Sequence, residues 1–346
     1  MPAAPTYALK IVRTDSELEC PVIDAELRAL GAELVLLPDG VSEADLAAEV
    51  ADADLLLMCY TPITKAVIDG AKRLKGIVKY GVGIDAIDID AARARQIPVV
   101  NIPEYAEETV AEGAFMLMIA LAKKLIPLDR AMHEEGWVWP TPQWMGADLA
   151  GKTVGLVGAG RIGRSMARMA GAGFRAHVLG YDPNVDGEDM ARAGVEKVED
   201  LSAMLSRCDF VTVHCVLTPR SKSLIGEVEL MAMKPSAFLI NVSRGAIVED
   251  AALLRALQEG WIAGAGLDVY SQEPLDRNSH PLRALFHMPN VILLPHLTFY
   301  TAEAMERLER ETLERCREVL DGQPVLVKSS DPRLRAQWHG VCFKRD

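Results

Sequence analysis

Residues 7–104 alternate between short apolar runs and stretches in which apolar residues recur every three or four positions. A short apolar run is typical of a buried strand, and the wider spacing is typical of an amphipathic helix. The predicted strands are Tyr7–Val12, Glu33–Leu37, Leu55–Met58, Gly76–Lys79 and Pro98–Asn101. The predicted helices are Ile23–Leu30, Glu43–Ala51, Lys65–Ala71 and Ala86–Arg95. Such alternation predicts a parallel sheet with helices on both faces.

The same alternation returns between residue 153 and about residue 295. The predicted strands there are residues 153–158, 177–181, 209–214, 237–242, 263–269 and 291–294. Parallel strands in this number are typical of a doubly wound nucleotide-binding domain, the Rossmann fold. Before them, Thr109–Leu125 is apolar nearly all round and predicts a buried helix. After them, Thr301–Asp321 predicts an amphipathic helix that returns the chain to the first series, and residues 327–346 form a polar, basic tail without clear periodicity.

Length and charge restrict the possible functions. The 346 residues are 50% hydrophobic, which is enough for two domains with separate cores. A formal net charge of -12 argues against nucleic-acid binding and against an anionic membrane surface, and no apolar run reaches the roughly 20 residues of a membrane span. The N-terminus shows no secretory signal, and the six cysteines show no metal-ligand spacing. We therefore expect a cytoplasmic protein with reduced thiols and no metal site.

Three glycines follow the apolar run Thr153–Val157 with the spacing GxGxxG, at Gly158, Gly160 and Gly163. Gly158 would allow a tight turn, Gly160 would let the backbone approach a pyrophosphate, and Gly163 would let helix and strand pack closely. The helix predicted after them offers free N–H groups and a positive dipole end to phosphates. The pattern predicts a dinucleotide site, and the alternative is an ordinary turn between strand and helix.

An acidic residue at the end of the next strand supports this prediction. Asp182 follows the predicted strand at 177–181, about 20 residues after the glycines, where the adenosine ribose of a dinucleotide should lie. A carboxylate accepts hydrogen bonds from two hydroxyls and repels a 2′-phosphate, and no arginine follows that could neutralise one. The sequence therefore favours NAD over NADP.

A second glycine-containing segment, Lys79–Asp85, follows a predicted strand of the first series. Open α/β sheets place ligands at the carboxyl ends of their strands. Exposed backbone N–H groups of Tyr80, Gly81, Val82 and Gly83 could hold a carboxylate there. A plain turn between strand and helix is the equally weighted alternative.

Three polar residues follow predicted strands of the second series, namely Arg244, Glu273 and His296. An arginine can hold a substrate carboxylate bidentately, and a histidine can exchange a proton with a hydroxyl or carbonyl oxygen. A glutamate can orient the imidazole and stabilise its cationic form. The alternative is a turn histidine and an ordinary salt bridge. His214, at the end of another strand, could line the nicotinamide pocket.

The segment Gly136–Trp144 carries three tryptophans among prolines and breaks the regular pattern. Large apolar side chains in such a segment favour an interface with another subunit or domain over a pocket wall.

Taken together, these motifs resemble the D-isomer-specific 2-hydroxyacid dehydrogenase family over nearly the whole chain. The matching stretches are Lys79–Asp85, Thr109–Glu112, Gly151–Gly163, Asp209–Thr218, Asn241–Asp250, Gly266–Pro274 and Pro295–Thr301. The resemblance implies an α/β protein with two doubly wound parallel-sheet domains. A Rossmann NAD-binding domain, residues 106–301, would be inserted into a flavodoxin-like substrate domain made of residues 1–105 and 302–346.

The resemblance also implies functional residues. Arg244, Glu273 and His296 would be the catalytic set, and Tyr80–Gly83 would bind the substrate carboxylate. The implied NAD-binding residues are Thr109, Gly158, Gly160, Arg161, Ile162, Gly163, Asp182, His214, Val216, Val242, Ser243 and Asp268. The family further implies a homodimer built on the nucleotide-binding domains and a small 2-hydroxy or 2-keto acid as substrate.

Two positions depart from the family pattern. Val216 replaces a proline, and Thr298 stands where a glycine or alanine is usual. Both departures keep the catalytic groups but leave the substrate open among glyoxylate, pyruvate, hydroxypyruvate, 3-phosphoglycerate and aromatic keto acids. Glu273 argues against formate dehydrogenase, which pairs its histidine with glutamine. A corepressor-type protein that senses NAD(H) without catalysis is the alternative function.

Overall fold

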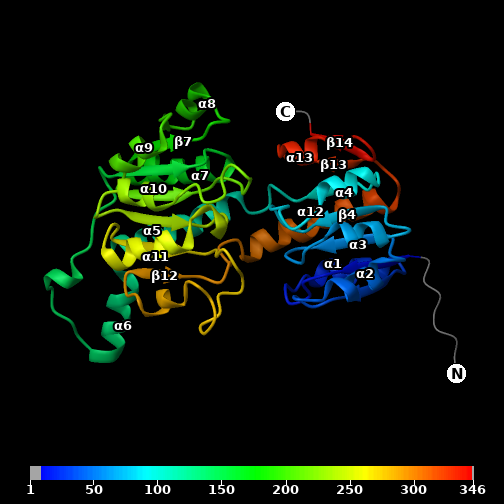
Figure 1. The fold of residues 1–346 in the computed structure, drawn as a ribbon, viewed down its shortest axis with the longest axis horizontal. Helices are drawn as coiled ribbons and strands as arrows, with labels where there is room; N and C mark the ends of the chain where they lie inside the picture. The colour runs from blue at the N-terminus through cyan, green and yellow to red at the C-terminus, as the bar shows by residue number, and fades with distance from the viewer. Residues whose placement is uncertain (1–8, 345–346) are drawn as a thin grey trace. The chain divides into compact units, whose positions relative to one another are not determined.

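The computed structural model describes residues 9–344, and the chain divides into two compact units (Figure 1). The first unit contains both ends of the chain, Met1–Ala106 and Thr301–Asp346. The second unit is the continuous segment Glu107–Tyr300. The second unit is therefore inserted into the sequence of the first.

A five-stranded parallel sheet forms the centre of the first unit, in the order β2-β1-β3-β4-β5. The strands are β1 (Lys10–Arg13), β2 (Glu33–Leu36), β3 (Leu55–Met58), β4 (Gly76–Lys79) and β5 (Val99–Asn101). This order is that of flavodoxin-like sheets, as expected. The five strands lie where the sequence predicts them, although Tyr7 and Ala8 of the first prediction lie outside the described residues.

Helices cover both faces of this sheet (Figure 1). They are α1 (Pro21–Ala29), α2 (Glu43–Val50), α3 (Lys65–Gly70), α4 (Ile89–Ala94) and α12 (Ala302–Leu320). The helices α1 and α12 pack against each other, while α3 packs between α2 and α4. The buried Glu309 of α12 accepts the backbone N–H groups of Val22 and Ile23 at 2.7 and 3.0 Å, which joins α12 to the start of α1. The predicted return of the chain through this helix is confirmed.

The C-terminal tail has regular structure that the sequence did not predict. The strands β13 (Val325–Val327) and β14 (Val341–Phe343) pair in parallel, and the short helix α13 (Pro332–Arg335) lies between them in the sequence. Three-residue strands are too short to show a hydrophobic period. The buried Gln337 joins the tail to β5, because its side chain bonds both the N–H and the carbonyl of Val99.

A seven-stranded parallel sheet forms the centre of the second unit, in the order β12-β11-β10-β9-β6-β7-β8. Its strands are β6 (Thr153–Val157), β7 (His177–Tyr181), β8 (Glu196–Lys197), β9 (Phe210–Val213), β10 (Phe238–Asn241), β11 (Gly264–Leu267) and β12 (Val291–Leu293). The order is that of a Rossmann sheet with one further strand. The prediction of six strands missed β8, because an edge strand of two charged residues has no apolar signature.

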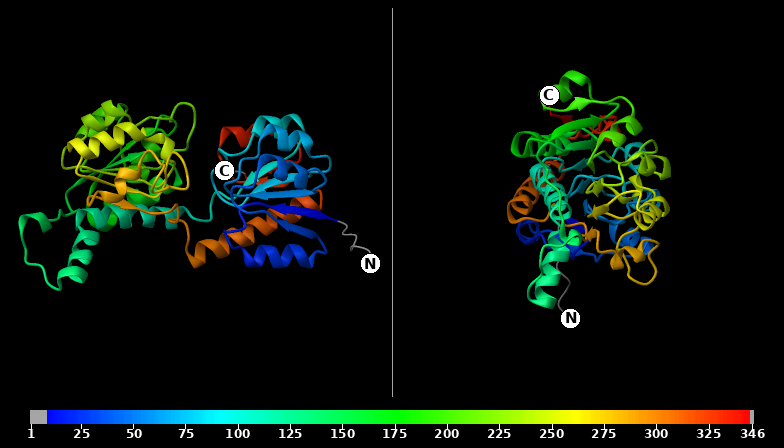
Figure 2. Two further views of the ribbon diagram at one scale, coloured as in Figure 1. Left: turned by 60° about the horizontal axis from the view of Figure 1, so that its bottom comes forward. Right: turned by 90° about the vertical axis from the view of Figure 1, so that its left-hand side faces the viewer.

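Helices and two apolar cores lie on the two faces of this sheet (Figure 2). The helices of the whole second unit are α5 (Glu107–Ala122), α6 (Leu125–Glu135), α7 (Arg161–Arg168), α8 (Gly187–Arg192), α9 (Leu201–Arg207), α10 (Glu227–Ala232) and α11 (Asp250–Glu259). One core contains side chains of α5 and α7, and the other contains side chains of α9, α10 and α11. No helix among residues 9–344 has the length and apolar character needed to cross a bilayer.

The predicted helix over Thr109–Leu125 corresponds to α5, which ends three residues earlier than predicted, and a second helix that the sequence did not predict follows it. α5 ends at Ala122, Lys124 adopts a left-handed conformation with φ of 51°, and α6 starts at Leu125. The break falls at the two lysines Lys123 and Lys124, and the left-handed conformation of Lys124 leaves no mark in the sequence pattern. Figure 2 shows α6 and the segment after it extending away from the rest of the second unit.

Candidate active site

The glycine loop lies at the carboxyl end of β6, where the strand order of the second sheet reverses between β6 and β9. Gly158 has a φ of 103°, and a Cβ there would lie 2.5 Å from the backbone nitrogen of Cys215. A Cβ at Gly163 would overlap the carbonyl oxygen of Gly158. Two of the three glycines are therefore required by close backbone packing, Gly158 against the segment after β9 and Gly163 within the loop, as the motif predicts.

The third glycine leaves room for a ligand. A Cβ at Gly160 would meet no atom within 4 Å, and Gly160 is the N-cap of α7, which begins at Arg161. The sequence analysis placed the start of this helix after the glycines. In the structure the helix starts three residues earlier, and Arg161, Ile162 and Gly163 lie in its first turn. A helix N-terminus beside open space suits the phosphates of a dinucleotide.

Asp182 lies directly beside the glycine loop. One carboxylate oxygen accepts the N–H of Ala159 at 3.0 Å, and the other accepts the N–H of Asn184 at 2.9 Å. The end of β7 therefore holds a carboxylate against the loop, as the sequence predicts. The loop, the helix start and this carboxylate together fit the two phosphates and the adenosine ribose of NAD.

The Arg244 loop follows β10 and is shaped by close backbone packing. A Cβ at Gly245 would overlap the backbone of Tyr270, so the two loops after β10 and β11 lie in contact. Asn241 donates its side-chain amide to the carbonyl of Arg244 at 3.0 Å and accepts the N–H of Ser243 at 3.1 Å. These contacts fix the backbone from which the Arg244 guanidinium extends.

Glu273 and His296 form a hydrogen-bonded pair. The Glu273 Oε2 lies 2.8 Å from the His296 Nδ1, and the Glu273 Oε1 accepts the N–H of Tyr270 at 2.9 Å. Burial alone would raise the pKa of the Glu273 carboxyl. The hydrogen bond and charge of His296, helped by the charge of Arg244, outweigh burial and hold this pKa below its usual range. The structure thus brings together the three residues that the sequence singled out.

Asp268 positions the loop that carries His296, a role that the sequence did not reveal. This fully buried carboxylate accepts the N–H of Leu297 at 2.8 Å, and both the N–H and the hydroxyl of Thr298, at 3.0 and 2.6 Å. His296 itself has a positive φ of 59°, so its backbone needs such support. Thr298 replaces the small residue usual in the family, and its hydroxyl supplies one of the three bonds.

His214 lies under the glycine loop as a neutral imidazole. Burial lowers the pKa of His214 to about 3. Its Nε2 lies 2.9 Å from the Thr212 hydroxyl, and its Nδ1 is buried without a hydrogen-bond partner among residues 9–344.

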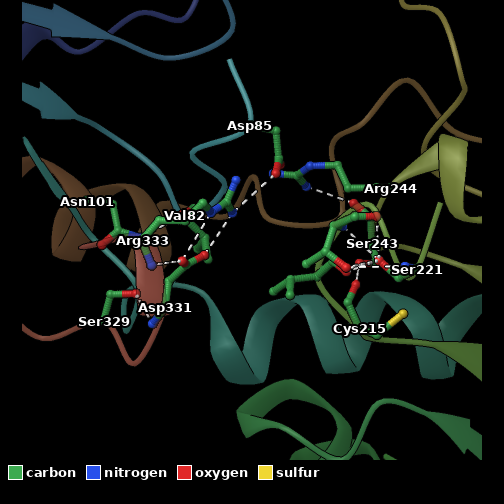
Figure 3. Close-up of polar contacts among 12 residues, drawn as sticks. Val82, Asp85, Asn101, Cys215, Ser221, Ser243, Arg244, Ser329, Asp331 and Arg333 are labelled. Atoms are coloured by element: carbon green, nitrogen blue, oxygen red, sulfur yellow. Dashed lines mark hydrogen bonds and ion pairs between the residues drawn. The ribbon is translucent and has the colours of Figure 1, made fainter. Parts of the chain in front are cut away.

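The other residues predicted to bind NAD lie in the same unit but differ in exposure. Val242 and Thr109 are buried, whereas Val216 is 61% exposed. Ser243 donates its hydroxyl to the carbonyl of Cys215 and thereby joins the loops after β9 and β10 (Figure 3).

The predicted carboxylate loop of the first unit follows β4. Tyr80 is fully buried, and its hydroxyl donates to the carbonyl of Thr14. The Asn101 side chain donates to the carbonyl of Val82 at 2.6 Å (Figure 3). The expectation of four exposed N–H groups is wrong for two of them, because the N–H groups of Tyr80 and Gly81 donate to the carbonyls of Met58 and Lys79 at 3.1 and 3.0 Å. The backbone N–H groups of Val82 and Gly83 donate to no group in the described part of the chain. Free N–H groups in a turn suit an anionic ligand.

Comparisons with known proteins agree with these motifs. A family model described as D-isomer specific 2-hydroxyacid dehydrogenase, NAD binding domain, matches residues 115–298, which are more than half of the 346-residue chain. A glyoxylate reductase of Korarchaeum cryptofilum is 40% identical over 269 residues, which are 77% of this chain and 79% of the relative.

Two further proteins extend the comparison. A D-3-phosphoglycerate dehydrogenase of Methanocaldococcus jannaschii is 37% identical over 285 residues, or 82% of this chain, but the match spans only 53% of that longer relative. The crystal structure of D-lactate dehydrogenase from Aquifex aeolicus, complexed with NAD and lactic acid, matches with a TM-score of 0.82 and 28% identity. That match covers 90% of this chain and 96% of the lactate dehydrogenase.

Fold and sequence therefore lead to one assignment. The family resemblance, the two-domain α/β fold and the use of NAD as cofactor are confirmed. The chain belongs to the D-isomer specific 2-hydroxyacid dehydrogenase family, and residues 115–298 match the NAD-binding domain of that family.

Proposed function

We propose that the protein is an NAD-dependent oxidoreductase that interconverts a small D-2-hydroxy acid and its 2-keto acid. The observation that carries the proposal is the 2.8 Å hydrogen bond between Glu273 and His296 beside the Arg244 loop. A carboxylate that is itself held by a backbone N–H orients the imidazole before any substrate arrives. This is the arrangement that a general acid or base requires.

In this proposal the cofactor supplies hydride transfer to or from the substrate C2. Gly158, Gly160, Gly163 and Asp182 hold the dinucleotide, with the first turn of α7 at its phosphates. The Nδ1 of His296 is engaged by Glu273, and Nε2 is the atom that exchanges a proton with the substrate oxygen in this proposal. Protonated His296 donates during reduction of a keto acid, and neutral His296 accepts during oxidation of a hydroxy acid.

Charged and polar donors hold the substrate in this proposal. The Arg244 guanidinium binds the carboxylate and carbonyl oxygens, because its planar fork matches two oxygen atoms. The loop Tyr80–Gly83 contributes the backbone N–H groups of Val82 and Gly83 to the carboxylate. The remaining NAD-binding residues implied by the family stay part of the proposal.

We also propose a homodimer in the cytoplasm. The segment from α6 to Met145 exposes several large apolar side chains. Leu125 is 55% exposed, Trp137 66%, Trp139 74% and Met145 73%. Exposed apolar groups gathered on an extended segment are typical of a subunit interface, here with a second copy of this chain.

The alternative is an NAD(H)-binding corepressor-type protein that uses the same fold without turnover. An intact Arg244, Glu273 and His296 set does not separate the two functions, whereas turnover does. A direct test is the loss of NADH absorbance with glyoxylate, hydroxypyruvate, pyruvate, 3-phosphohydroxypyruvate and phenylpyruvate. These keto acids include those suggested by the relatives' names.

The matched control for this test is His296→Ala. Reduction of at least one keto acid should occur, and the substitution should lower turnover by roughly 10²–10⁴ while NADH binding is retained. If none of the keto acids is reduced while NADH still binds, the corepressor alternative replaces the enzyme.

A further inference from the structure

A buried histidine outside the catalytic set is bonded to the loop that carries Glu273. His280 is 3% exposed, and its Nε2 lies 2.9 Å from the carbonyl oxygen of Gln272, the residue directly before Glu273. Its imidazole also packs edge-to-face on the ring of Tyr270, with 6.3 Å between the ring centroids. The side chain of His280 therefore contacts this loop at two residues, Tyr270 and Gln272.

The second ring nitrogen determines which tautomer His280 adopts. Nδ1 accepts the backbone N–H of Leu282 at 3.0 Å, so it carries no proton. The proton of the neutral ring is then on Nε2, which donates it to the carbonyl of Gln272. Both ring nitrogens of this buried imidazole are therefore used in hydrogen bonds, and the bond to Gln272 has a fixed direction.

The turn that carries His280 is held by bonds of its own. The Asp276 Oδ1 accepts the N–H groups of Asn278 and Ser279 at 2.9 and 2.7 Å, and also the Ser279 hydroxyl at 2.7 Å. A side-chain acceptor that binds N–H groups two and three residues ahead closes a compact turn. The contact between His280 and Gln272 therefore joins two segments, one of which is fixed independently of the other.

The loop that His280 contacts also places the Glu273 carboxylate. The Glu273 Oε1 accepts the N–H of Tyr270 at 2.9 Å, and the Glu273 Oε2 lies 2.8 Å from the His296 Nδ1. The carboxylate is thus attached to the backbone of residues 270–273 twice, through its own Cα and through the Tyr270 N–H. A shift of this backbone would move the carboxylate relative to the imidazole of His296.

We propose that His280 is a positioning residue that fixes the Glu273 carboxylate against His296. This role rests on the proposed function and extends the proton-carrying pair to a third, buried residue. His280 acts through the backbone of Gln272 and the ring of Tyr270, and it takes no part in the proton transfer itself. Without the bond to Gln272, the carboxylate is held less firmly and stabilises the protonated form of His296 less.

The test uses three substitutions that separate the two hydrogen bonds of His280. His280→Gln can place an amide N–H near the position of Nε2 and so keep the bond to Gln272. His280→Asn can place an amide oxygen near the position of Nδ1 and keep only the bond to Leu282, and His280→Ala loses both. In pH–rate profiles, the fall in keto-acid reduction should move to lower pH by about 0.5–1 pH unit in His280→Asn and His280→Ala, the equivalent of weakening one hydrogen bond. His280→Gln should stay near the wild-type profile.

A double substitution shows whether the effect passes through Glu273. In the Glu273→Gln background, adding His280→Asn should not move the profile further, because the carboxylate through which His280 acts is gone. A merely structural role would lower the melting temperature and leave the pH of the transition unchanged. The proposal is overturned if His280→Asn keeps the wild-type transition, if His280→Gln shifts it as far as His280→Asn, or if His280→Asn shifts it equally with and without Glu273→Gln.

A second readout applies if the wild type reduces no keto acid, in which case the proposed function fails. The pH midpoint at which the ring signals of His296 titrate in NMR spectra then takes the place of the pH–rate profile. These signals are identified by their loss in His296→Ala. A lower midpoint in His280→Asn than in the wild type and in His280→Gln supports the positioning role, and the same midpoint in all three proteins contradicts it.

Discussion

The two glycine-containing loops follow parallel strands at the same end of their sheets, yet they are held in different ways. In the loop from Gly158 to Gly163, the chain packs against itself. A side chain at Gly163 would overlap the carbonyl of Gly158, a residue only five positions away. A side chain at Gly158 would likewise meet the backbone of Cys215, so close contacts between backbone atoms fix the shape of this loop.

The loop Tyr80–Gly83 is held by distant parts of the chain. Asn101 binds the carbonyl of Val82, and the N–H of Ile102 donates to the carbonyl of Gly81 at 3.0 Å. Arg333 from the C-terminal tail lies at Asp85. This loop therefore depends on side chains about 20 and about 250 positions away. The cofactor loop Gly158–Gly163 is therefore fixed mainly by contacts between backbone atoms, whereas the substrate loop Tyr80–Gly83 is held by side chains from outside its own segment.

The largest effect is expected within the cofactor loop. Gly163→Ala should destabilise the protein by about 1–3 kcal/mol and abolish measurable NADH binding, because the new methyl group displaces the backbone of Gly158. Gly160→Ala is the matched control: its methyl group meets no protein atom, so the melting temperature should stay near that of the wild type while NADH binding weakens. Thermal unfolding and NADH titration measure both. Equal melting temperatures for the two variants would refute the local packing argument.

A smaller effect is expected at the carboxylate beside that loop. Asp182→Ala removes the acceptor for the ribose hydroxyls and for the N–H of Ala159. The dissociation constant for NADH should rise about 10- to 100-fold, as for loss of a charged hydrogen bond, and discrimination against NADPH should relax. Titration of both cofactors into wild type and variant provides the measurement. A wild-type preference for NADPH would contradict the assigned role of Asp182.

The smallest effect is expected in the substrate loop. Asn101→Ala removes the 2.6 Å bond to Val82 and should raise the KM for the keto acid about fivefold, the equivalent of one hydrogen bond, without changing NADH affinity. Asn290→Ala is the matched control, because Asn290 also donates its amide to a backbone carbonyl, that of Ala263 at 2.8 Å, away from both loops. An equal KM increase in both variants would mean that the loop has no special dependence on Asn101.

This contrast also explains what could be predicted from the sequence. The central strands were predicted within a residue or two because buried parallel strands are continuous apolar runs. The short strand β8, the break at Lys124 and the structured tail were missed, because each is defined by conformation or by contacts distant in sequence. The pairing of Gln337 with Val99, across 238 positions, leaves no local pattern.

The residues of the candidate site also fall into two groups, those that the local sequence predicts and those whose contacts it does not show. The glycine spacing, Asp182 and the positions of Arg244, Glu273 and His296 after strands could be read directly, since each depends on local sequence context. The bonds from Asp268 to Leu297 and Thr298 could not, because they join two loops 29 and 30 positions apart.

The central claim is that the Glu273–His296 pair carries the proton. The pKa of Glu273 is held below its usual range, so the carboxylate is ionised at neutral pH and binds the Nδ1 side of the His296 imidazole. Reduction needs the protonated imidazole and should fall as pH rises, whereas oxidation needs the neutral imidazole and should increase. His214, with a pKa lowered to about 3, is neutral throughout this range and cannot produce either change.

The most direct measurement is therefore the pH–rate profile in both directions for the wild type and Glu273→Gln. The neutral amide no longer stabilises the imidazolium, so the fall in reduction and the increase in oxidation should both move to lower pH. His214→Asn, the control, should leave the pH of both transitions unchanged. A Glu273→Gln profile that coincides with the wild type in both directions would contradict the proposed role of the pair.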